Sequence, residues 1–212
     1  MGYKKGDETR AAILKAAKKL FIETGYEATT FRKIGDALGI NHNLITYHFS
    51  SKQTLAEEIL VDFFVAEDKL LHTIAPKDIS PIVTYAIRNR LHYKILACNP
   101  DILRFYTDAV SSDFLQHIFL SIPGTWDSYT SIFSWYELPL RYPKEYYAAM
   151  ETASEVEIIK RFKKEMYEDD VFLYFVESIL PIYIGVPESD IKDAFSRAKE
   201  LLNDIDVTGF TF

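Results

Sequence analysis

Apolar residues recur at helical spacing along most of this chain. Residues 13–21 place apolar side chains at i, i+3, i+4, i+7 and i+8, which predicts an amphipathic helix that Gly25 ends. Shorter apolar sets predict helices over residues 30–38, stopped by Gly39, and over residues 41–49. Ser50 and Gln53 have the spacing of a capping box, so we expect a fourth helix to begin there.

Proline marks the helix starts in the rest of the chain. Ser80-Pro81 and Asn99-Pro100 each resemble an N-cap followed by proline at the first helical position. No long run of alternating apolar and polar residues suggests a strand, so the predicted fold class is all-α. The expected helices cover residues 81–98, 100–111, 113–121, 126–137, 144–167, 169–184 and a last one that ends near 204.

The amino-acid composition indicates a globular protein and excludes several kinds of site. The chain has 212 residues, 48% apolar and 26% charged, which is typical of a globular protein with a sizeable core. Its single cysteine, Cys98, excludes an internal disulfide and a zinc site built on several thiolates. We see no secretory signal, and the most apolar run, residues 171–184, is too short to span a bilayer. We therefore expect a cytoplasmic protein that does not enter the membrane.

The charge is distributed unevenly. Residues 1–55 carry nine Lys and Arg against five Asp and Glu, a net charge of +4, whereas the remainder carries −11. A basic head on an acidic body fits binding to nucleic acid, which responds to local positive charge, although a chance asymmetry on a solvated surface would look the same.

Residues 30–49 have the pattern of a helix-turn-helix. Two short helices flank the tight turn at Leu38-Gly39-Ile40, and the second could enter the major groove of DNA while the first packs across it. Arg32, Lys33 and Lys52 flank this second helix as expected phosphate contacts. Its outer face shows short or planar hydrogen-bonding side chains: Asn41, His42, Asn43, Thr46, Tyr47 and His48.

The same region resembles the N-terminal signature of the TetR/AcrR family of transcriptional regulators. The resemblance rests on Thr9-Arg10, Ile13-Leu14, Ala16-Ala17, Leu20-Phe21, Gly25-Tyr26, Thr29-Thr30, Ile34, Leu38-Gly39-Ile40, Tyr47-His48-Phe49, Ser51-Lys52 and Leu55. It implies an all-helical homodimer with an operator-binding N-terminal domain, residues 1–55, and a helical ligand-binding and dimerisation domain, residues 56–212.

The resemblance also implies roles for individual residues. Thr30 would cap the second helix and touch phosphate, Tyr47 and His48 would meet the DNA backbone, and Lys52 would bind phosphate. Residues 41–43 fall where the family reads bases. The family often has glycine where this chain has Asn43 and tyrosine where it has Thr46, so no operator sequence is carried over.

The acidic remainder is rich in aromatic residues. The aromatic residues between 105 and 136 suggest either an ordinary core or the lining of a pocket for a small hydrophobic or aromatic ligand. The candidate lining residues are Phe105, Tyr106, Trp126, Tyr129 and Phe133. Residues 171–184 are apolar nearly all round, so this helix needs two partners, and we expect the second to be its copy in a homodimer.

These observations predict a transcriptional regulator, a repressor that a small molecule releases from palindromic double-stranded DNA. We predict no catalytic residue, metal ligand or cofactor, because the chain lacks a glycine-rich phosphate loop, a nucleophile elbow and a metal-ligand cluster. An enzyme without a recognisable motif and a helical protein–protein adaptor remain alternatives. An adaptor would not need the polar face at residues 41–48.

Overall fold

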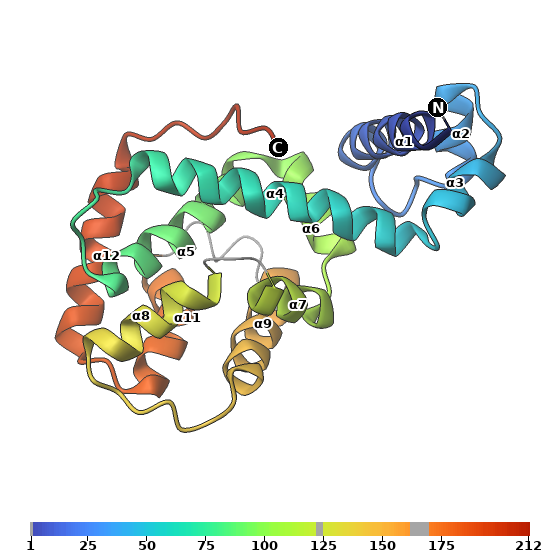
Figure 1. The fold of residues 1–212 in the computed structure, drawn as a ribbon. Coiled ribbons are helices and arrows are strands. Elements are labelled where there is room, and N and C mark those ends of the chain that lie inside the picture. Colours follow the sequence, from blue (N-terminus) through green and yellow to red (C-terminus); the bar gives the residue numbers. More distant parts are fainter. Residues whose placement is uncertain (1, 122–124, 162–169) are drawn as a thin grey trace. The chain divides into compact units, whose positions relative to one another are not determined.

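The computed structural model describes residues 2–121, 125–161 and 170–212. Within these ranges it contains eleven α-helices and no strand, which confirms the all-α prediction (Figure 1). The helices form two compact units. No helix in these ranges is long and apolar enough to cross a membrane.

The first unit runs to Phe64 and also takes in Pro100–Val110. It contains α1 (Gly2–Thr24), α2 (Phe31–Leu38), α3 (His42–His48), the first part of α4 (Lys52–Ile74), and α6 (Pro100–Ala109). Its core is made of apolar side chains that are at most 1% exposed, namely Ile13, Phe21, Ile34, Ile45, Phe49, Leu55, Ile59, Phe63, Phe105 and Tyr106. The predicted stripe on α1 thus supplies Ile13 and Phe21 to this core.

The expected cap of α4 is wrong by one residue. The hydroxyl of Ser51, not that of Ser50, accepts a hydrogen bond from the backbone N–H of Thr54 at 3.0 Å. The Gln53 side chain is used elsewhere, because its Oε1 accepts from the Tyr26 hydroxyl at 3.0 Å and its Nε2 donates to the carbonyl of Ala109 at 2.9 Å. A glutamine that holds a tertiary contact cannot also reach back to cap its own helix.

The second unit comprises Val65–Asn99 and Ser111–Phe212. Besides the rest of α4 it contains α5 (Pro81–Cys98), α7 (Ser112–Ser121), α8 (Thr125–Trp135), α9 (Lys144–Arg161), α11 (Asp170–Ile184) and α12 (Glu188–Asn203). The prolines at 81 and 100 stand at helix starts, as predicted. The expected helix over 144–167 is described to Arg161, and its last predicted residues lie outside the described ranges.

Helix α5 forms the centre of the second unit. Ten of its side chains are buried, and it lies beside α12 and also packs against α8 (Figure 1). Not all of this core is apolar. The His92 ring lies between two carboxylates, with Nδ1 at 3.0 Å from Glu67 and Nε2 at 3.3 Å from Glu155. Burial alone would lower the pKa of His92, but these two carboxylates raise it to about 10.

Candidate nucleic-acid interface

The turn between α2 and α3 is fixed by backbone hydrogen bonds. Thr30 caps α2, since its hydroxyl accepts from the N–H of Lys33 at 3.2 Å. At the other end Gly39 adopts a left-handed conformation with φ of 66°, which glycine tolerates without steric cost. The N–H of Ile40 then donates to the carbonyl of Gly35 at 3.0 Å, and that of Gly39 to Asp36 at 3.3 Å. This pair of bonds is a Schellman motif, so the chain leaves α2 in one defined direction.

Gly35 matters for a different reason. A Cβ atom added at this position would lie 2.8 Å from the carbonyl oxygen of Ile40 and 3.4 Å from the nitrogen of His42. Both neighbours are backbone atoms, so the turn closes directly over the glycine. Sequence reasoning missed this residue, although a glycine inside a helical pattern often marks a close approach of this kind.

Two buried residues anchor the inner side of α3. Ile45 is inaccessible to solvent and Phe49 nearly so. The Arg10 guanidinium lies over the Phe49 ring, 4.7 Å from its centroid, and forms an ion pair with Glu58. Helix α3 is therefore held from α1 and α4 at once, and its opposite side is left to solvent.

The outer face of α3 is polar and exposed, as predicted. Asn41, His42, Asn43, Thr46 and Tyr47 are exposed, and His48 is half-buried. Tyr47 is 82% exposed, which is unusual for so large a ring. Its ring packs edge-on against His48, with centroids 5.2 Å apart. The face thus offers hydrogen-bonding groups and one protruding phenol.

Asn41 and Asn43, the two asparagines of this face, differ in their hydrogen bonding. The Asn41 side chain caps α3, because its Oδ1 accepts from the N–H of Asn43 at 2.9 Å. That bond occupies the oxygen that a bidentate contact to adenine would need. The Asn43 side chain has no such bond among the described residues, so both its amide oxygen and its amide NH2 group are available.

The three predicted phosphate contacts differ in how they are held. Lys33 donates to the carbonyl of Ala28 at 2.7 Å, and Arg32 is exposed with no partner in the described part of the chain. The Lys52 ammonium donates to the carbonyl of Tyr26 at 3.1 Å and lies 4.1 Å from the centroid of that ring. Lys52 is therefore already positioned before any ligand arrives, whereas Arg32 is free to move.

The five predicted pocket residues are divided between the two units. Phe105 and Tyr106 lie in the core of the first unit, where the Phe105 ring stacks on Phe21 with centroids 5.4 Å apart. Trp126, Tyr129 and Phe133 belong to the second unit. The physical reason is that α6, which carries the first two, packs against α1.

The other three do lie in one aromatic cluster. The Tyr129 ring centroid is 4.4 Å from that of Phe119 and 6.2 Å from that of Trp126. The Phe133 ring meets Tyr147 edge-on at 5.3 Å. In the described ranges no group of three or more His, Cys, Asp or Glu side chains is arranged to hold a metal ion.

Comparison with known proteins agrees with this geometry. Residues 13–59 match the family described as bacterial regulatory proteins, tetR family. Over 73 residues the chain is 41% identical to the HTH-type transcriptional repressor Rv3405c of Mycobacterium tuberculosis, a match that covers 34% of this chain and 39% of that one. Over 54 residues it is 44% identical to the transcriptional repressor KstR2 of Rhodococcus jostii, covering 26% of each. The chain thus matches well under half of the length of these relatives.

A solved structure extends the likeness to the whole fold. The crystal structure of RolR in complex with resorcinol matches 92% of this chain and 96% of its own, with a TM-score of 0.72 and 16% sequence identity. Residues 13–59 thus match the tetR family of bacterial regulatory proteins, and the all-helical fold is similar to that of RolR. Rv3405c and KstR2 are both named as HTH-type transcriptional repressors.

Proposed function

We propose that this protein is a homodimeric transcriptional repressor that binds a palindromic operator and leaves it when a small molecule binds. The observation that carries the proposal is α3, whose inner side is buried and whose polar outer face is exposed, with Arg32 on α2 and Lys52 on α4. Such a helix fits the major groove, and the flanking cations fit phosphates. We assign base contacts to Asn43 and His42 and backbone contacts to Tyr47, His48, Thr30, Lys33 and Lys52.

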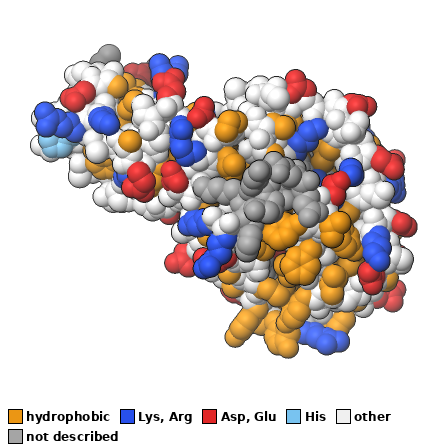
Figure 2. Space-filling view, turned by 180° about the vertical axis from the view of Figure 1, so that it is seen from behind, with side chains coloured by type: hydrophobic (Ala, Val, Ile, Leu, Met, Phe, Trp, Pro, Cys, Tyr) orange, Lys and Arg blue, Asp and Glu red, His pale blue; other side chains and the backbone are white. Residues whose placement is uncertain are grey.

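The exposed side of α11 supports the homodimer. The sequence predicts a helix that is apolar nearly all round, and in the single chain Val171 is 77% exposed, Phe175 63% and Ile182 55%. Figure 2 shows a group of apolar side chains on the surface of the second unit. Large apolar patches of this kind are usually covered by a partner, and a two-fold pair would suit two operator half-sites.

The ligand site is proposed in the second unit, near Trp126, Tyr129 and Phe133. Polar groups accompany these rings, because the hydroxyls of Tyr85 and Tyr129 donate to Glu151 at 3.1 and 3.4 Å. Burial raises the pKa of Glu151 to about 7, and the nearby negative charge of Glu155 adds to this effect. RolR, with its bound resorcinol, supports a small aromatic ligand as the class to test first. Helix α4 contributes residues to both units and is the proposed route of the signal.

The test is binding to DNA that lies upstream of the gene. Fluorescence anisotropy should show tighter binding to this DNA than to a random duplex, with affinity falling steeply as salt rises. Lys52→Ala should weaken binding to both duplexes alike. Asn43→Ala should lose about 1–3 kcal/mol on the specific duplex only. Lys77→Ala, an exposed lysine of the second unit, is the charge-matched control. Equal affinity for both duplexes at low salt would reject the proposal.

A further inference from the structure

The second unit contains a hollow whose charge is opposite to that of its surroundings. It lies among α5, α11 and α12 and has a volume of about 290 Å³. Among the described residues that line it are three cations, Arg90, Lys94 and Lys199, and no acidic side chain. Residues 56–212 carry a net charge of −11, so a positively lined hollow is not what this part of the chain would give on average.

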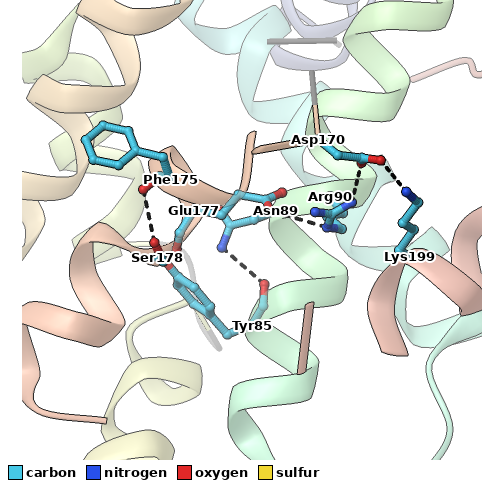
Figure 3. A network of polar contacts seen from close by, with 8 residues as sticks. All are labelled: Tyr85, Asn89, Arg90, Asp170, Phe175, Glu177, Ser178 and Lys199. Carbon is cyan, nitrogen blue, oxygen red and sulfur yellow. Dashed lines mark hydrogen bonds and ion pairs between the residues drawn. The ribbon is translucent and has the colours of Figure 1, made fainter. Parts of the chain in front are cut away.

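Arg90 is largely buried, with only 10% of its side chain exposed, whereas Lys199 is 60% exposed. It also lines an adjoining hollow of about 220 Å³ together with Lys199. Its Nη1 donates to Asp170 at 3.3 Å, and Asp170 lies between Arg90 and Lys199 (Figure 3). Its Nε is 3.3 Å from a carboxylate oxygen of Glu177 but makes no hydrogen bond, although it is buried. Arg90 therefore places a largely buried guanidinium on the wall that the two hollows share.

The carboxylates near these cations offset only part of their positive charge. Asp170 is ionised, because the hydrogen bond from Lys199 lowers its pKa and outweighs partial burial. Burial raises the pKa of Glu177 to about 8, so this group is largely neutral at pH 7. Lys94 donates to backbone carbonyls at the end of α12, which are dipoles and not full charges. Positive charge therefore remains in excess in the hollow.

The remaining lining is mainly apolar. Tyr93 and Leu202 are buried, Leu173 is half-buried, and Ala97 is exposed at the rim. Cations combined with apolar walls suit an amphipathic anion, in which a charged head is attached to a hydrocarbon or aromatic body. We propose that this hollow binds a small carboxylate that carries an apolar tail.

This site is separate from the surfaces that the proposed function uses. Leu173 and Glu177 lie on one side of α11, four residues apart, whereas Val171 and Phe175 lie on its exposed side. The hollow also shares none of its lining residues with the aromatic cluster around Tyr129. The proposal does not rest on operator binding.

Isothermal titration calorimetry of the full chain at pH 7 tests the proposal without DNA. The probe is octanoate, and octanamide, with the same tail and no charge, is its matched control. Octanoate should bind with one site per chain and about tenfold more tightly than octanamide, the typical value of a charge-assisted hydrogen bond. Equal affinity of the two compounds, or no octanoate binding at millimolar concentration, would overturn it.

Two variants locate the binding. Lys199→Gln should weaken octanoate binding about tenfold, whereas Lys77→Gln, an exposed control outside the hollow, should leave it unchanged. Ala97→Trp should abolish binding by filling the rim, and it alters no charge. Circular dichroism checks that each variant is folded, and if Lys199→Gln is not, Ala97→Trp decides. Unchanged octanoate affinity in Ala97→Trp, or equal affinity in the two lysine variants, would refute the site. Failure of this test would leave the proposed operator binding standing, because that binding does not depend on the hollow.

Discussion

Replacing Gly35 by alanine tests how the helix-turn-helix is built. The new Cβ would lie 2.8 Å from the Ile40 carbonyl oxygen and 3.4 Å from the His42 nitrogen. Real Cβ atoms essentially never approach a neighbour closer than 3.0 Å, so the α2–α3 turn must move. Since the clash is with backbone atoms, no side-chain rotation can relieve it.

The magnitude follows from two opposing terms. Overpacking of this kind costs roughly 1–3 kcal/mol. Alanine gains about 0.5–1 kcal/mol over glycine in a helix, which offsets part of that cost. The two ranges leave roughly 0–2.5 kcal/mol, and we expect a net loss of about 1 kcal/mol in the free energy of unfolding of the first unit. Gly6, on α1, is the matched control, since a Cβ there meets nothing within 4 Å. Gly6→Ala should therefore be neutral or stabilising.

Urea unfolding followed by circular dichroism measures both variants, and hydrogen exchange localises the change to α2 and α3. Operator affinity should fall about tenfold in Gly35→Ala, because binding would have to restore the strained turn at a similar cost. A Gly35→Ala protein as stable as Gly6→Ala, with unchanged operator affinity, would show that the close approach at Ile40 does not constrain the turn.

Three further predictions follow from other parts of the structure. Asn41→Ala should cost about 1 kcal/mol of stability through loss of the α3 cap, measured by urea unfolding, whereas Asn43→Ala should leave stability unchanged. Phe175→Glu should give a folded monomer in light scattering, and a variant that remains dimeric would move the interface away from α11. Folding raises the pKa of Glu177 to about 8 and that of His92 to about 10. Each group therefore adds fully to the free energy of unfolding at low pH, and this stabilisation is lost as pH rises through its folded-state pKa. Urea unfolding should therefore show stability falling between pH 5 and pH 9, less steeply in Glu177→Gln; equal slopes in the two proteins would refute the buried, protonated Glu177.

The sequence was a good guide to local structure. The all-α class, the helix starts at Pro81 and Pro100, the turn at Gly39 and the polar outer face of α3 are all found in the structure. Each of these features depends on residues close together in the chain: proline fixes φ, glycine accepts a left-handed turn, and helical spacing separates an apolar face from a polar one. Such signals can be read without knowing what packs against the helix.

Tertiary packing decided the features that depend on distant residues. Phe105 packs beside Phe21 because α6 returns to the first unit, and no spacing within 100–110 reveals which core those aromatics join. Ser51 caps α4, whereas the Gln53 side chain binds the distant Tyr26 hydroxyl and Ala109 carbonyl. The positive hollow around Arg90 arises only when α5, α11 and α12 come together, in a region that by composition is acidic. Local periodicity is encoded by neighbours in the chain, whereas these contacts exist only after helices that are far apart in sequence have packed.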